Sequence, residues 1–192
     1  DSSSEDHTVD LARDAGLSVH QIDKTSFNHG ATRQLGVSLM IDVDIVVFLT
    51  QDAILVSLDS INNLISAFDN PDVGAAYGRQ LPRKTASHIE EHSRIFNYPE
   101  KSRITSLEDS KKLGIKTAFI SNSFAAYRCA ALEEVGGFPL NTILGEDTYV
   151  AAQMLLKGRT IAYCAGAEVY HSYDYSYLEE FRRYVDIGVF HS

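Results

Sequence analysis

The apolar residues in the first part of the chain follow two alternating patterns. Residues 45–49 form an unbroken apolar run rich in β-branched side chains, which is typical of a strand covered on both faces. Residues 57–68 instead carry leucine, isoleucine and phenylalanine at helical spacing, after another helix expected at 30–40 and before a strand at 73–77. This short-range alternation predicts an α/β sheet that is doubly wound, with right-handed crossovers.

The flanking segments extend this pattern. The chain opens on a polar turn, where Ser4 is a candidate N-cap for a helix that stops at Gly16, and a short strand is expected at 18–22. Residues 79–117 interrupt the alternation with a local excess of lysine and arginine and one helix, near 86–97. The last third predicts a strand at 119–127, a helix from 129, a turn at 136–139, a helix at 146–157, strands near 161 and 169, and an amphipathic helix from 177.

Composition narrows the possible classes of protein. The chain has 192 residues, 44% of them apolar, which suits one domain with a sizeable core. A net charge of -9 argues against a general nucleic-acid binder. Cys129 and Cys164 lie far apart, which argues against a disulfide framework and a thiolate metal site and fits a reducing compartment. No signal peptide opens the chain, and no apolar run approaches the roughly 20 residues that span a bilayer.

Several common catalytic motifs are missing from the sequence. There is no Walker loop, no G-x-G-x-x-G, no nucleophile elbow and no H-E-x-x-H. Their absence argues against the common nucleotide hydrolases, dinucleotide dehydrogenases and serine hydrolases.

Asp52 and His171 are candidate metal ligands. Asp52 follows the run at 45–49, and ligands of open α/β sheets bind beyond the carboxyl ends of strands, where a carboxylate can hold a hard cation. A lone Asp after a strand is more often a turn residue or a helix cap. His171 ends a predicted strand and could complete the coordination, although a single histidine is usually structural.

Four further acidic and basic positions are candidates. Glu146 and Asp147 follow a glycine and open a helix, so they either complement the helix dipole or supply a general base. Arg33 could reach a phosphate or lie at the surface. Asp1 could hydrogen-bond a base or a ribose, or act as part of a helix cap.

The order of short motifs resembles family 2 glycosyltransferases, within them the bacterial rhamnosyltransferase-like group that builds surface polysaccharides. The motifs are DSSSEDHT at 1–8, FNHGATRQLG at 27–36, VFLTQDA at 47–53, YGRQLP at 77–82, SNSFAAYR at 121–128, EVGGFP at 134–139, GED at 145–147 and HS at 171–172.

This resemblance implies a fold and an activity. The fold would be GT-A, an α/β fold with a mixed, mostly parallel sheet and helices on both faces. The whole chain, 1–192, would be one glycosyltransferase domain, with a nucleotide-sugar-binding half at 1–78, a covering or inserted region at 79–117 and an acceptor-side half at 118–192. The activity would be inverting transfer of a sugar, with rhamnose favoured, from a nucleoside-diphosphate donor to a saccharide or lipid-linked acceptor.

The resemblance also assigns roles to the candidate residues. Asp52 and His171 would hold Mg²⁺ or Mn²⁺ on the diphosphate of a donor, favoured as dTDP-rhamnose, and Asp1, Arg33 and Gln51 would lie on the donor side. Asp147 would be the general base, with Glu146 beside it contacting a sugar, and the glycine turn at 136–138 would shape the acceptor side. The enzyme would work in the cytoplasm, and its basic region 79–117 would face a lipid-linked acceptor or the inner face of the membrane, or form an ordinary charged cover.

The chain departs from the family pattern at two places. Thr50 replaces the first acid of the D-x-D motif, and the family's first strand, first helix and second strand are expected to be missing, because the chain begins in the turn after that second strand. These departures leave open a non-catalytic sugar-nucleotide-binding module or an inactive fragment of the same fold. A sugar-1-phosphate nucleotidyltransferase on a similar sheet is a further alternative.

Overall fold

A six-stranded sheet forms the centre of the protein, in a computed structural model that describes residues 1–142, 144–171 and 177–190. Along the sheet the strands follow the order β1-β5-β3-β6-β2, and β4 also pairs with β6. Their bounds are β1 Ile45–Leu49, β2 Ile54–Leu55, β3 Val73–Leu81, β4 Arg103–Thr105, β5 Phe124–Arg128 and β6 Thr160–Tyr170. The strands predicted near 161 and 169 are therefore one long strand, and the one predicted at 119–127 begins only at Phe124.

The sheet is mixed, as expected for the GT-A class. The pair β3–β6 is parallel, and the pairs β1–β5, β3–β5, β2–β6 and β4–β6 are antiparallel. The share of parallel pairs is lower than the expectation of a mostly parallel sheet, because β5 lies between β1 and β3 and runs against both. As a result β1, β3 and β6 all point the same way, and their carboxyl ends lie at one edge.

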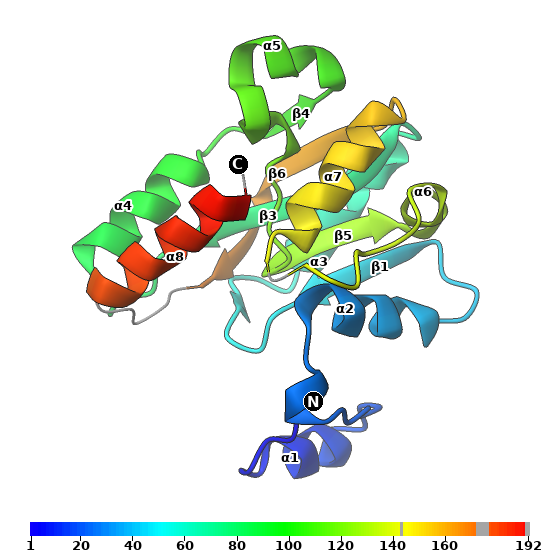
Figure 1. The fold of residues 1–192 in the computed structure, drawn as a ribbon, viewed down its shortest axis with the longest axis vertical. Coiled ribbons are helices and arrows are strands. Elements are labelled where there is room, and N and C mark those ends of the chain that lie inside the picture. Colours follow the sequence, from blue (N-terminus) through cyan, green and yellow to red (C-terminus); the bar gives the residue numbers. More distant parts are fainter. Residues whose placement is uncertain (143, 172–176, 191–192) are drawn as a thin grey trace.

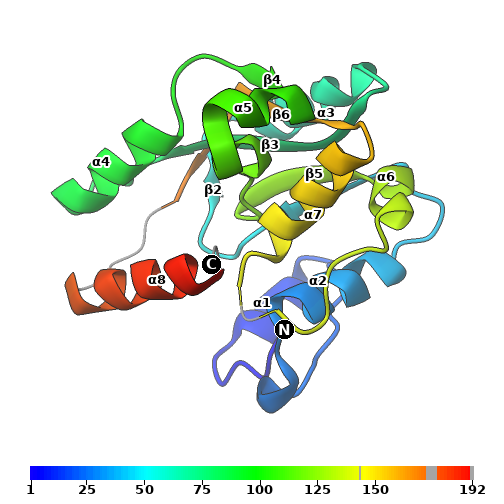
Figure 2. The ribbon, with the colours of Figure 1, turned by 45° about the horizontal axis from the view of Figure 1, so that its top comes forward.

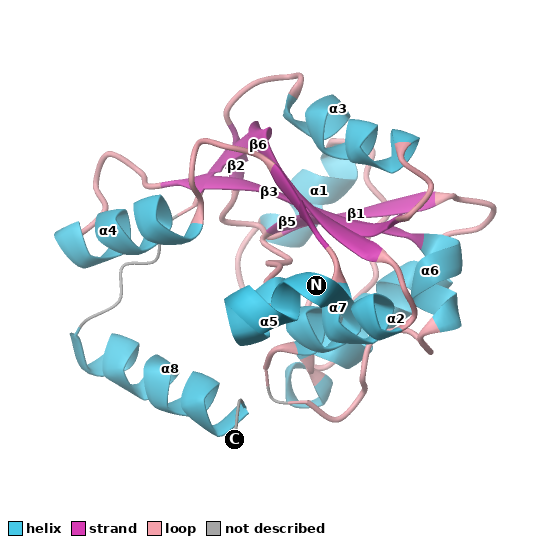
Figure 3. Ribbon diagram, turned by 90° about the horizontal axis from the view of Figure 1, so that it is seen from above, coloured by secondary structure: helices cyan, strands magenta, loops and turns pink. Residues whose placement is uncertain are grey.

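Helices cover both faces of the sheet, as predicted (Figure 1). Figure 3 shows α3 on one face and α2, α5, α6 and α7 on the other. The helices are α1 Thr8–Asp14, α2 His29–Ser38, α3 Ser60–Ile65, α4 His88–Asn97, α5 Ser110–Leu113, α6 Cys129–Glu134, α7 Glu146–Leu156 and α8 Tyr177–Phe190. Short 3₁₀ turns occupy η1 Lys24–Ser26, η2 Ser66–Asp69, η3 Leu107–Asp109 and η4 Gly114–Ala118.

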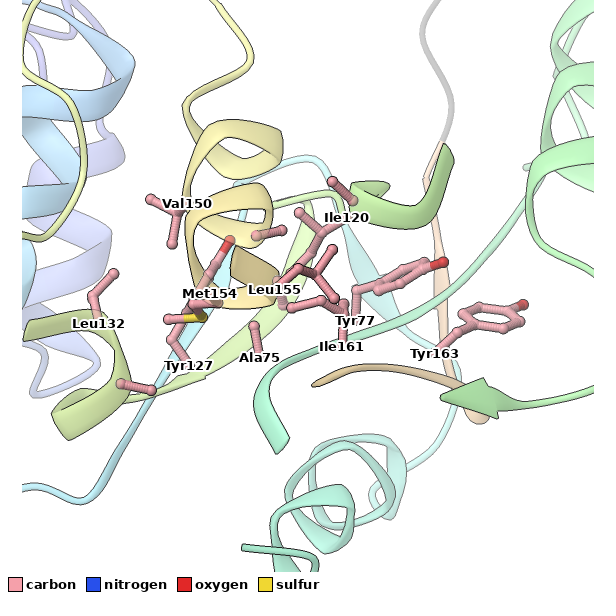
Figure 4. Packing of buried hydrophobic residues seen from close by; sticks show 14 of the residues in the cluster. Ala75, Tyr77, Ile120, Tyr127, Leu132, Val150, Met154, Leu155, Ile161 and Tyr163 are labelled. Atoms are coloured by element: carbon pink, nitrogen blue, oxygen red, sulfur yellow. The ribbon is translucent and has the colours of Figure 1, made fainter. Parts of the chain in front are cut away.

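The core has two layers because side chains alternate across the central strands. Tyr77 and Tyr127 point to the α7 side, where they pack with Met154 (Figure 4). On the other face, Phe124 packs in the cluster that contains Leu64 of α3, and both side chains are 0% exposed. Burying a side chain of this size contributes about 1.5–3 kcal/mol, so these clusters fix the register of the central strands.

The amino-terminal segment lies outside this core. In Figure 1, α1 lies beyond α2, away from the sheet, and α1 contains no buried residue. The helix begins at Thr8 without a side-chain cap, so Ser4 is not its N-cap. The strand predicted at 18–22 does not form in the described chain; only single backbone hydrogen bonds link Asp1 with His20 and Ile22.

Region 79–117 lies between the end of β3 and β5. It contributes the end of β3, the helix α4, the short strand β4 on β6, and α5. Helix α4 begins with a capping box formed by the Ser87 hydroxyl and the Glu90 carboxylate. In the part of the chain that the structure describes, no helix combines the length and the apolar character needed to cross a membrane.

Gly78 allows β3 to approach its neighbours closely. A Cβ at this position would lie 2.3 Å from the Phe124 ring and 2.5 Å from the Ala167 carbonyl oxygen. We therefore expect Gly78→Ala to lower the free energy of unfolding by about 1–3 kcal/mol, because a backbone oxygen cannot move aside as a flexible side chain can. Urea denaturation followed by circular dichroism measures this change.

Gly36→Ala is the matched control. Gly36 lies inside α2, and a Cβ there meets nothing within 4 Å. Since alanine favours the helix by up to about 1 kcal/mol over glycine, this variant should be neutral or stabilised. Equal losses of stability in the two variants would contradict the close approach at Gly78.

Candidate active site

Polar residues gather at the edge of the sheet where β1, β3 and β6 end. Asp52 follows β1, Gln80 lies near the end of β3, and His171 follows β6. Because β5 runs the other way, the residues before it, 121–123, reach the same edge. This is the edge at which open α/β sheets bind their ligands.

Asp52 and His171 meet at this edge, as predicted. Asp52 Oδ2 lies 3.2 Å from His171 Nε2, and the imidazole is buried, with 1% of the residue exposed. Gln80 Oε1 lies 2.8 Å from His171 Nδ1, and Gln80 Nε2 donates a 2.9 Å hydrogen bond to Ser121 Oγ. With its amide nitrogen committed to Ser121, Gln80 presents an acceptor to the ring, which places a proton on Nδ1.

This hydrogen-bonding pattern suits a cation. A neutral His171 with its proton on Nδ1 turns the Nε2 lone pair toward the carboxylate of Asp52, so a proton or a metal ion must separate the two. An imidazole nitrogen and a carboxylate oxygen 3.2 Å apart match two neighbouring ligands of an ion with bonds of about 2.0–2.2 Å. Among the described residues, no group of three or more His, Cys, Asp or Glu side chains is placed to hold a metal.

The neighbours of Asp52 keep it ionised. Partial burial opposes ionisation, but the hydroxyl of Thr50 and, when a proton lies on its Nε2, the positive charge of His171 outweigh it and lower the pKa of Asp52. The backbone carbonyl of Asp52 also accepts a hydrogen bond from Arg83. A charged carboxylate on a fixed turn is the state in which a divalent cation binds.

Glu146 and Asp147 open α7, and the structure separates their roles. Glu146 is 5% exposed, and its Oε1 accepts hydrogen bonds from Arg33 Nη1 at 2.6 Å and from Asn122 Nδ2 at 3.3 Å. The carboxylate of Glu146 is therefore occupied by protein groups. The sequence-based placement of Arg33 on the phosphates and of Glu146 on a sugar did not foresee that the two residues pair with each other.

Asp147 is held by backbone groups on both of its oxygens. Oδ2 accepts from Asn122 N at 3.2 Å, and Oδ1 accepts from Thr148 N at 2.7 Å. Burial, and next the neighbouring charge of Glu146, raise the pKa of Asp147 to about 6. A carboxyl group with a pKa near neutrality can exchange protons at physiological pH, which is what a general base requires.

The segment 121–123 connects the two clusters. Ser121 bonds to Gln80 beside the Asp52–His171 pair, while Asn122 bonds to both Glu146 and Asp147. The side chain of Asn122 is fixed from behind by Tyr127, whose hydroxyl donates to Asn122 Oδ1 at 2.8 Å. The candidate cation ligands and the candidate base thus belong to one network.

Two predicted donor-side residues stay apart from this network. Gln51 is exposed in the turn after β1. Asp1 is also exposed; its carboxylate accepts from Ser4, and its amino group donates to the His20 carbonyl at 2.7 Å. Ser172, which follows His171, lies outside the described residues.

Sequence reasoning missed Gln80 and Asn122 as functional residues. Both are buried polar side chains, 1% and 2% exposed. Each lies in a motif that carried the family resemblance, YGRQLP and SNSFAAYR, and this is the signal that could have identified them. Apart from Tyr127, their partners come from distant parts of the chain, which spacing alone does not reveal.

The sequence model described as glycosyl transferase family group 2 matches residues 45–184. The chain is 52% identical, over 193 residues, to the O-antigen chain rhamnosyltransferase RfbN of Salmonella typhimurium, and 47% identical, over 192 residues, to the O-antigen chain rhamnosyltransferase WbaN of Salmonella anatum. Each alignment covers 100% of this chain, which spans 62% and 61% of the length of these relatives.

Solved structures share the fold. The mannosyltransferase PcManGT from Pyrobaculum calidifontis, solved with GDP-Man and Mn²⁺, superposes with a TM-score of 0.63 at 18% identity, covering 96% of this chain and 53% of its own. TarS 1-349 of S. aureus gives a TM-score of 0.64 at 15% identity, covering 90% of this chain and 49% of its own. At these identities the likeness concerns the fold alone.

The surroundings of Asp147 predict its titration. We expect the side-chain carboxyl carbon to titrate near pH 6 in a ¹³C NMR experiment, because burial and Glu146 both disfavour its charge. Since this raises the pKa above the unfolded value near 4, the stabilising contribution of Asp147 is complete below that pH and is lost as the pH rises through 6. The exposed Asp59 serves as the internal control. A midpoint for Asp147 below 4 would contradict this description of its surroundings.

Proposed function

This chain belongs to glycosyl transferase family group 2, and we propose that it carries the reaction centre of an inverting glycosyltransferase that builds a surface polysaccharide. One observation carries the proposal: the carboxylate of Asp147, which is suited to accept a proton, and the side chains of Asp52 and His171, which are suited to bind a cation, lie at one sheet edge and are joined through residues 121–123. The Asp147 carboxylate suits activation of an acceptor hydroxyl, and the Asp52–His171 pair suits binding of a cation that neutralises a diphosphate.

The proposed reaction is a single displacement. The carboxylate of Asp147 takes the proton of an acceptor hydroxyl, while that oxygen forms a bond to the anomeric carbon from the face opposite the leaving group. The bond between this carbon and the nucleoside diphosphate breaks, and the diphosphate leaves with the bonding electrons. One displacement inverts the anomeric configuration, and no protein nucleophile takes part.

Asp52 and His171 are the residues that would hold Mg²⁺ or Mn²⁺ in this reaction. A divalent cation supplies charge that stabilises the diphosphate as it departs. Gln80 contributes by fixing the tautomer of His171, so that Nε2 faces Asp52. Asp1 and Gln51 remain our candidates for contacts to the nucleotide of the donor. Arg33 could contact the donor only if its ion pair with Glu146 were broken.

The donor sugar we propose is rhamnose, as dTDP-rhamnose. The support is the identity of 52% and 47% to two O-antigen chain rhamnosyltransferases along the whole chain. Because the chain spans only 62% and 61% of those relatives, activity and substrates of the whole protein stay proposals.

The acceptor and the location are also part of the proposal. We assign residues 1–78 to the donor side and 118–192 to the acceptor side, with a saccharide or lipid-linked acceptor. The basic region 79–117 exposes Phe96 beneath Lys116, whose ammonium lies 4.6 Å from the ring centre. Apolar and cationic side chains together suit peripheral contact with an anionic membrane at its cytoplasmic face, and the free Cys129 and Cys164 suit that reducing side.

Asp147→Asn tests the reaction. In the whole protein, we expect this variant to lose at least about a thousandfold in the rate of transfer from dTDP-rhamnose, because an amide cannot accept the proton. Its affinity for dTDP should stay within a few-fold of the wild type, which calorimetry measures. Near-normal transfer by Asp147→Asn would refute the general base, and nucleotide binding without any transfer by the wild type would indicate a binding module.

Asp52→Asn tests the cation site. Calorimetric titration of dTDP into this chain should show binding that strengthens when Mn²⁺ is present, because Asp52 and His171 provide charge and a lone pair for the ion. We expect Asp52→Asn to reduce the Mn²⁺-dependent part at least about tenfold. Asp59→Asn, which removes an exposed carboxylate of the same type, is the control. Affinity for dTDP that does not respond to Mn²⁺ in the wild type would count against the site.

A further inference from the structure

Helix α2 and the residue before it contact the segment that precedes α7 at several points (Figure 2). Asn28 Nδ2 donates to the Thr142 carbonyl at 2.8 Å, and Phe138 N donates to Gln34 Oε1 at 2.8 Å. At Gly30 a Cβ would lie 1.9 Å from the Pro139 carbonyl oxygen, so the backbones are in close contact. The helix therefore fixes residues 138, 139 and 142, which lie shortly before Asp147 in the sequence.

The last contact of this series is electrostatic. Arg33 Nη1 and Glu146 Oε1 lie 2.6 Å apart, with side-chain exposures of 17% and 6%. Removing either partner would leave the other charge with little access to water, which makes the pair costly to break. Its geometry is thus well determined, unlike that of an exposed ion pair.

The ion pair acts on Asp147 through Asn122. The Glu146 oxygen that binds Arg33 also accepts from the side chain of Asn122, and the backbone N–H of the same asparagine donates to Asp147. We propose that Arg33 and Glu146 are positioning residues, which hold Asn122 and set the charge around the base, and that neither contacts a substrate. This inference rests on the proposed function, since it assigns their roles in that reaction.

The charges around Asp147 make the two partners distinguishable. The groups that face it are Glu146 on its own helix, Arg33 on α2 and the buried Tyr127 on β5, while His29 lies next to Arg33 and Glu146. The anion of Glu146 raises the pKa of Asp147, and the cation of Arg33 lowers it. Loss of the cation and loss of the anion must therefore move the titration in opposite directions, although both break the same ion pair.

The experiment compares Arg33→Gln with Glu146→Gln. In the whole protein, the rate of transfer should fall at low pH as Asp147 becomes protonated, and this fall is the acidic limb of the pH–rate profile. We expect the limb to move to higher pH in Arg33→Gln and to lower pH in Glu146→Gln, by roughly half a pH unit or more in each case. We expect both variants to lose about tenfold in kcat, because the base is less well held, and to keep the affinity for dTDP within a few-fold. Arg33→Lys keeps the charge and should leave the limb near its wild-type position.

A control variant and a second measurement distinguish a failure of this inference from a failure of the proposed reaction. Arg159→Gln breaks an exposed ion pair with Glu134 on the same side of the sheet, 3.1 Å apart, and should leave the limb unchanged. The ¹³C titration of Asp147 in the three variants gives the same comparison without any turnover, so an inactive protein still tests this inference. Shifts in the same direction, or no shift, would overturn it. A loss of dTDP affinity of tenfold or more in Arg33→Gln alone would also overturn it, since Arg33 would then be a phosphate ligand.

Discussion

The direction of one strand, β5, determines where the chemistry of this protein lies. Because β5 is paired antiparallel with both β1 and β3, its beginning lies where they end. The residues before it, 121–123, are thereby placed between the turn after β1 and the start of α7. Had β5 run parallel to its neighbours, Asn122 would lie at the opposite edge, and the two clusters of polar side chains would have no common member.

The buried polar residues around this edge form two hydrogen-bonded chains that meet at the neighbouring residues 121 and 122. One runs from His171, beside Asp52, through Gln80 to Ser121, and the other runs from Tyr127 through Asn122 to the two acids. Gln80, Ser121, Asn122 and Glu146 each have hydrogen-bond partners here, which offsets the cost of removing them from water. Networks of this kind lock orientation, which suits a site that must hold a carboxylate at a fixed place.

The sequence alone predicted the parts that depend on local patterns. The apolar run of β1, the stripe of α3 and the acids that open α7 were all found, as were the fold class and the Asp52–His171 pair, the latter through the resemblance. The strand predicted at 18–22 was wrong, because this segment pairs with no strand in the described chain. The Arg33–Glu146 pair could not be foreseen, since it joins residues 113 positions apart.

The position of α2 has a practical consequence for work with relatives. The helix spans 29–38 and lies before residue 45, where the family match begins, yet it supplies the cation beside the two acids. A chimera assembled by exchanging only the matched segment would bring the acids of one protein against the helix of another. Such a chimera would also need the matching α2 residues. These are Arg33, Gly30, which faces Pro139, and Gln34, which accepts a hydrogen bond from Phe138 N.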